Sequence, residues 1–78
     1  MEKVIKRDGR MVEFDKDKII NAIEQAMKQT KKGVDAQISN KIANYVQQLD
    51  KDMTVEEIQD IVENKLMNSN RKDVAKEY

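Results

Sequence analysis

The sequence predicts an α+β domain that is mostly helical, with a short N-terminal β-hairpin covering a bundle of about four helices. Three observations support this prediction. An Asp-Gly dipeptide separates two short apolar-bearing runs near the N-terminus, apolar side chains then recur at helical spacing in three segments, and a Thr-x-x-Glu sequence opens the third segment. A chain of 78 residues forms one small domain with little room for the buried cleft of a complete enzyme.

The hairpin is expected within residues 3–14, because Asp8-Gly9 is the dipeptide that best tolerates the positive φ angles of a two-residue turn. In the register of such a turn, Ile5 pairs with Val12 and Lys6 with Met11. Each face of this hairpin mixes apolar and basic side chains, so the hairpin has to pack against other elements.

Asp15 is the expected N-cap of the first helix, which runs to about Thr30 and is followed by Gly33, a residue suited to the left-handed conformation. A second helix is expected after a cap near Asp35 and ends before a break over residues 50–53.

The third helix has the best-defined start, because Thr54 and Glu57 form a capping box. Asn70 is the expected cap of a fourth helix that holds Val74 and Tyr78. Since the chain stops inside this element, we expect residues 1–78 to be one domain, the N-terminal fragment of a longer protein.

Composition excludes several classes of function. The sequence has no cysteine and no histidine, which removes disulfides, thiolate metal sites, cysteine nucleophiles and the usual general base. We therefore expect no catalytic residues and no metal site. Its 15 basic residues balance 15 acidic ones, which argues against broad nucleic-acid binding. The absence of a long apolar run or signal peptide argues against a membrane partner and makes the cytoplasm the expected location.

A motif at the hairpin carries the best functional signal. Lys6 and Arg7 lie beside the tight turn, and Lys18 lies in the first turns of the next helix, where amide groups add positive potential. Three cations converging at one end would suit a triphosphate. If this triphosphate belongs to a nucleotide, its base needs a flat apolar slot, for which the candidates are Val4, Val12, Ile19 and Ile58, with Gln59 facing the polar edge of the base.

The same residues identify a family resemblance. The pattern V-x-K-R-D-G followed by F-x-x-x-K-I, formed by Val4, Lys6, Arg7, Asp8, Gly9, Phe14, Lys18 and Ile19, resembles the opening of the ATP-cone family. The segments TVEEIQDIVENKL and DVAKEY also resemble this family, so the likeness extends over the whole chain.

The resemblance implies a small β cap over a helical bundle, with ATP or dATP held between the cap and the first and third helices. The residues that it and the preceding analysis assign to the nucleotide are Val4, Lys6, Arg7, Gly9, Val12, Asp15, Lys18, Ile19, Thr54, Ile58 and Gln59. Whether Mg²⁺ accompanies the nucleotide is left open.

The resemblance further implies an allosteric domain that controls the activity of a ribonucleotide reductase. Its partner would be the catalytic domain in the same chain, with nucleotide-dependent oligomerisation as a second consequence. We expect the parent to be the large subunit, with some preference for the anaerobic glycyl-radical class. Two alternatives remain: the cone of a nucleotide-sensing repressor of reductase genes, and a helical protein-interaction module without a ligand.

Overall fold

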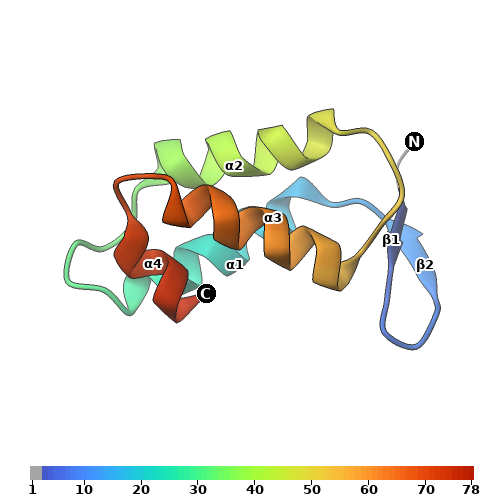
Figure 1. Cartoon of the computed structure of the whole chain (residues 1–78), viewed down its shortest axis with the longest axis horizontal. Helices are drawn as coiled ribbons and strands as arrows, with labels where there is room; N and C mark the ends of the chain where they lie inside the picture. Colours follow the sequence, from blue (N-terminus) through green and yellow to red (C-terminus); the bar gives the residue numbers. More distant parts are fainter. Residues whose placement is uncertain (1–2) are drawn as a thin grey trace.

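The computed structural model describes residues 3–78, and its three long helices run along the long axis of the molecule with a small sheet at one end (Figure 1). The strands are β1 (Lys3–Ile5), β2 (Met11–Glu13) and β3 (Met53–Thr54), and the helices are α1 (Lys16–Lys28), α2 (Ala36–Gln48), α3 (Val55–Met67) and α4 (Lys72–Glu77). The predicted mostly helical α+β class is confirmed. Met1 and Glu2, the first residues of the predicted domain, lie outside the described residues.

The sheet has three strands in the order β2-β1-β3, one more than the predicted hairpin. Strand β2 pairs with β1 in antiparallel fashion, whereas β3 pairs with β1 in parallel, with Ile5 opposite Thr54. The backbone N–H of Lys3 also donates to Asp52 Oδ1 at 2.8 Å. The predicted break over residues 50–53 therefore leads directly into a strand that closes the sheet.

The predicted hairpin register was wrong by one residue, because the loop has three residues instead of two. Lys6 N–H donates to the carbonyl of Arg10 at 2.8 Å, and Gly9 N–H donates to the carbonyl of Lys6 at 2.9 Å. Gly9 has φ of 88°, which is the left-handed conformation that follows a type I turn in a three-residue hairpin loop.

The corrected register changes which side chains share a face of the sheet. Val4 lies opposite Val12, and Ile5 lies opposite Met11. A shift of one residue turns a strand's side chains to the other face. As a result, Val4 and Val12 lie together on the face that looks onto the helices.

The three long helices begin where the sequence predicted. Asp15 Oδ1 accepts from the N–H of Asp17 at 3.0 Å, and the side chain of Asp35 caps α2 in the same way. At the start of α3 the capping box is complete, because Thr54 Oγ1 accepts from Glu57 N–H and Glu57 Oε1 accepts from Thr54 N–H, both at 3.0 Å. Helix α1 ends at Lys28.

The predicted cap of the last helix was wrong. The residue before α4 is Arg71, not Asn70, and no side chain caps the helix. Instead Ser69 Oγ accepts from Arg71 N–H at 3.0 Å, so the serine of the Asn-Ser-Asn stretch turns the chain into α4. Gly33 adopts the predicted left-handed conformation, with φ of 75°.

The core lies between the helices and under the sheet. Fully buried side chains come from α1, α2, β3, α3 and α4; the largest are Ile23, Met27, Val46, Met53, Val62, Leu66 and Val74. Because Met53 belongs to β3, the sheet contributes directly to this core and is held against the bundle.

Arg71 is a buried charged residue, only 5% exposed, that fixes α4 to the loop between α1 and α2. Its guanidinium donates to the carbonyl of Gly33 at 2.7 Å, to Thr30 Oγ1 at 3.0 Å and to Asp73 Oδ1 at 3.2 Å. Hydrogen bonding to Arg71 lowers the pKa of the Asp73 carboxyl. Helix α4 is therefore anchored at its N-terminal end, and its C-terminal end leads towards the sheet.

Candidate functional site

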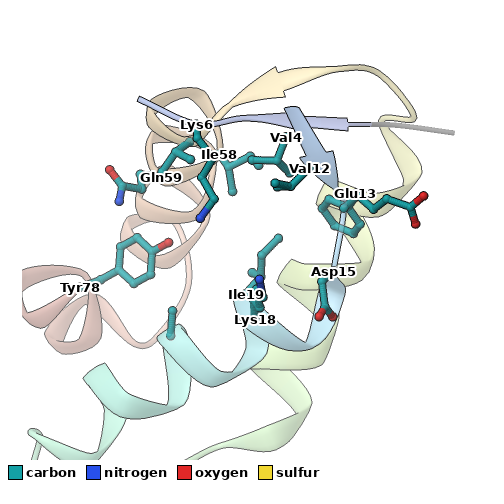
Figure 2. A pocket seen from close by; sticks show the side chains of 13 residues that line it. Val4, Lys6, Val12, Glu13, Asp15, Lys18, Ile19, Ile58, Gln59 and Tyr78 are labelled. Carbon is teal, nitrogen blue, oxygen red and sulfur yellow. The ribbon is translucent and has the colours of Figure 1, made fainter. Parts of the chain in front are cut away.

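A pocket of about 200 Å³ lies between the sheet and the helices. Its walls come from β1, β2, the start of α1, the first turns of α3 and the residue that follows α4 (Figure 2). The sheet forms one side of the pocket and α1 the opposite side. The position is the one that the sequence predicted for the nucleotide, between the cap and the first and third helices.

Most of the predicted site residues lie together in this pocket. Those that line it are Val4, Lys6, Val12, Asp15, Lys18, Ile19, Ile58 and Gln59. They bring an apolar slot and two lysines into one place, although they come from segments more than 50 residues apart in the sequence. Their contact with a nucleotide stays a prediction.

Three predicted residues do not line the pocket. Arg7 lies in the hairpin loop, where its Nε is 3.1 Å from Glu56 Oε2 at the start of α3, and its side chain is 74% exposed. Gly9 is an exposed residue of the same loop. The Thr54 side chain is occupied as the cap of α3.

The two pocket lysines come from opposite walls. Lys6 extends from the sheet into the space above α1, and Lys18 rises from the first turns of α1 (Figure 2). Two carboxylates also border the pocket, but Figure 2 shows that of Glu13 pointing away from its centre, and that of Asp15 caps α1. The inner surface of the pocket is therefore apolar with positive charge from the two lysines.

Sequence reasoning missed five residues that line the pocket: Glu13, Phe14, Ala22, Val55 and Tyr78. Phe14 belongs to the motif but was not assigned to the site, although alternation along the strand from Val12 gives it the same face. Ala22 follows Lys18 by one helical turn, a spacing that places both on one side of α1. No local sequence pattern predicts Tyr78 as a pocket residue, because its position depends on how α4 packs.

Tyr78 forms the wall opposite the apolar slot, and its phenol oxygen points into the pocket (Figure 2). Burial, with a smaller contribution from the nearby Glu63 carboxylate, raises the pKa of the phenol above its ordinary value. The hydroxyl therefore stays protonated near neutral pH and is available as a hydrogen-bond donor.

The sequence as a whole matches the family model described as the ATP cone domain, over residues 2–78. This chain belongs to the ATP cone family. The match covers every element of the fold and every residue of the pocket, and the family resemblance inferred from the hairpin motif is thereby confirmed.

Relatives of this ATP cone include ribonucleoside-diphosphate reductases. The chain is 42% identical over its full length to the vitamin B12-dependent ribonucleoside-diphosphate reductase of Thermoplasma acidophilum. It is 32% and 34% identical, over 96% of its length, to the ribonucleoside-diphosphate reductase alpha subunits of Chlamydia muridarum and Chlamydia pneumoniae. The ATP cone spans 11% of the first relative and 9% of the other two. None of these three names refers to an anaerobic enzyme, so the preference for an anaerobic parent stays a prediction.

Residues 3–78 contain no cluster of three or more acidic, cysteine or histidine side chains placed to hold a metal ion. Within that same range, every helix is too short or too polar to span a bilayer.

Proposed function

We propose that this ATP cone binds ATP and dATP in the pocket between the sheet and α1. The observation that supports this proposal best is the combination of an apolar slot with Lys6 and Lys18 on opposite walls, in a chain of the ATP cone family. A volume of about 200 Å³ is below the ~300–1,000 Å³ of pockets that enclose a drug-sized ligand. We therefore propose that the pocket encloses only the base and sugar and that the phosphates extend to its rim.

The adenine base would occupy the apolar slot. Val4 and Val12 form the sheet side of the slot. Ile19 of α1 and Ile58 of α3 form its helical side, so a flat ring would lie between two apolar surfaces. Gln59 borders the slot and carries both a donor and an acceptor for the polar edge of the base. Asp15 is proposed to contact the nucleotide at the start of α1.

The phosphates would be held by Lys6, Lys18 and Arg7. Lys6 and Lys18 already line the pocket, and each supplies a mobile positive charge. Arg7 contacts Glu56 instead, but this ion pair is largely exposed and therefore weak, about 0–1 kcal/mol. A triphosphate offers Arg7 a stronger bidentate partner, so we propose that Arg7 leaves Glu56 when the nucleotide binds. Gly9 and Thr54 act indirectly, by shaping the hairpin loop and by starting α3.

The biological role that we propose is control of a ribonucleotide reductase of which this ATP cone is part. ATP would keep the enzyme active, and dATP would turn it off by favouring another quaternary arrangement. An effector shifts such an equilibrium only by its difference in affinity for the two states, typically about 1–3 kcal/mol. The domain itself would catalyse no reaction, and its proposed location is the cytoplasm. The reductase relatives favour this role over that of a repressor cone.

Calorimetric titration of the 78-residue chain tests the proposal. ATP and dATP should both bind, without release of inorganic phosphate. Lys6→Ala and Lys18→Ala should each weaken binding by about 1.5–3 kcal/mol, the worth of a charge-assisted contact, with little change in melting temperature. Lys28→Ala is a matched control, because Lys28 is exposed at the far end of the same helix as Lys18.

Each of the opposite results would overturn part of the proposal. If neither nucleotide binds at millimolar concentration, the chain is a helical interaction module instead. If Lys28→Ala weakens binding as much as Lys18→Ala does, the effect is one of general charge and the phosphates are not bound at this pocket.

A further inference from the structure

A second cavity, the α2–α3 hollow, lies between these two helices at the end of the bundle away from the sheet. It has a volume of about 430 Å³ and is lined by Ile38, Lys41, Ile42, Tyr45, Lys65, Asn68, Ser69 and Asn70. None of these residues lines the pocket beneath the sheet, and Figure 1 shows the turn from α3 to α4 at the opposite end of the molecule from β1 and β2. A ligand of the α2–α3 hollow is therefore separate from the proposed nucleotide.

The α2–α3 hollow carries positive charge that the chain itself does not neutralise. Lys41 and Lys65 line it, and no aspartate or glutamate of residues 3–78 does so. The ion pairs within that range involve neither lysine. In a chain whose 15 basic and 15 acidic residues balance, two lysines without a carboxylate form a local surplus of positive charge. The hollow therefore favours a ligand with negative charge.

One of the two lysines is positioned by a contact between the helices. Lys65 Nζ of α3 lies 3.8 Å from the centroid of the Tyr45 ring of α2, which is a cation–π contact. The contact restricts Lys65 before any ligand binds, so less entropy is lost when its charge is used. It also occupies one face of the Tyr45 ring. A planar base would have to displace Lys65 in order to stack on that face, so the contact disfavours a second nucleotide here.

The remaining lining residues combine apolar surface with amide groups. Ile38, Ile42 and the ring of Tyr45 supply apolar surface from α2. Asn68 and Asn70 are exposed between α3 and α4, and each side-chain amide offers both a donor and an acceptor. A peptide backbone offers the same two groups, whereas an inorganic anion mainly accepts. The lining therefore suits a peptide with an apolar side chain better than it suits free phosphate.

We propose that the α2–α3 hollow binds a short acidic segment of a partner protein, with carboxylates on either side of an apolar residue. Lys41 and Lys65 come from different helices, so each can pair with one carboxylate while the apolar residue packs on the isoleucines. In an extended peptide alternate side chains point to the same face. The pattern Glu-x-Leu-x-Glu therefore presents all three side chains to the hollow. This inference does not depend on nucleotide binding in the pocket beneath the sheet.

The test is an NMR titration of the isotope-labelled chain with the peptide Ser-Glu-Ser-Leu-Ser-Glu-Ser, capped at both ends. We expect amide signals of the residues that line the α2–α3 hollow to shift, and those of the pocket beneath the sheet to stay unchanged. Lys41→Gln and Lys65→Gln should each weaken binding by about 2- to 5-fold, the equivalent of one exposed ion pair. Lys51→Gln is the matched control, because Lys51 is exposed two residues before β3 and lines neither cavity.

A second peptide, with glutamine in place of both glutamates, loses both ion pairs and should bind about 4- to 25-fold more weakly. Equal binding of the two peptides would overturn the proposal, and so would the absence of any shift at millimolar peptide. It would also be overturned if Lys51→Gln weakened binding as much as Lys41→Gln, or if inorganic phosphate shifted the same amides at the same concentration, because the hollow would then respond to charge alone. Shifts of these amides with protein concentration, without peptide, would instead identify a second copy of the chain as the occupant.

Discussion

Replacing Arg71 by methionine should destabilise the domain by about 2 kcal/mol. Methionine fills much of the same space but has no donor, so the carbonyl of Gly33 and Thr30 Oγ1 both lose a hydrogen bond from a charged group. Such bonds are worth about 1.5–3 kcal/mol each, and burial of the guanidinium offsets part of this sum. The Asp73 side chain is 35% exposed and can hydrogen-bond water instead, so the loss of its contact with Arg71 adds little to the destabilisation.

This change is large for a domain of this size. A single small core supplies only about 3–5 kcal/mol, and for 60–100 residues each kcal/mol corresponds to about 4–8 °C in melting temperature. We therefore expect thermal unfolding, followed by circular dichroism, to move down by about 8–16 °C.

The control is Arg10→Met. Arg10 also forms an ion pair, with Asp8 at 2.7 Å, but its side chain is 69% exposed. Exposed pairs contribute about 0–1 kcal/mol, so this variant should melt close to the wild type. The reasoning is refuted if Arg71→Met melts no lower than Arg10→Met, because burial would then not decide the value of the contact.

Three further predictions concern the cap and the start of α3. Gly9→Val should abolish nucleotide binding while circular dichroism still reports the helices, because valine strains the backbone at φ of 88°; Gly9→Asn, which tolerates this conformation, should bind. Glu56→Gln should raise ATP affinity in calorimetry, since it frees Arg7, and unchanged affinity would mean that Arg7 does not reach the phosphates. Hydrogen bonding to Thr54 N–H lowers the pKa of Glu57, so its stabilising contribution is present above the ordinary pKa of 4.5 and is lost as pH falls through the lowered value. Acid titration of stability should therefore be shallower for Glu57→Gln, and identical titration curves would contradict this.

The parts of the fold that the sequence predicted correctly depend on neighbours along the chain. Asp15 and Thr54 cap helices through side-chain contacts with residues two or three positions away, and such signals are visible in a single sequence. Strand β3 has only two residues and exists because it pairs with β1, which is almost 50 residues earlier. Its pairing depends on tertiary packing, so no local pattern marks it as a strand.

The hairpin register and the pocket also combine features that local sequence predicts with features that depend on tertiary packing. Asp8-Gly9 identified the turn, but both two-residue and three-residue loops place glycine in a left-handed position, and the dipeptide alone does not separate them. The motif located the pocket lysines, whereas the partner of Arg7 and the place of Tyr78 depend on how α3 and α4 pack. The sequence therefore named Arg7 without its partner Glu56 and left Tyr78 unassigned, because both depend on contacts between residues distant in the sequence.

The parallel pairing of β1 with β3 has a consequence for the order of folding. Strand β1 is synthesised near the start of the chain, yet its partner around Thr54 and its contact with Asp52 arrive almost 50 residues later. Closing a loop of this length costs entropy that the local helices do not have to overcome, and helices form faster than long-range strand pairs. During synthesis we therefore expect the edge of β1 that pairs with β3 to stay unpaired until α1 and α2 have formed. We expect the pocket to form in the last step, so that only a completely folded domain would present the proposed nucleotide site.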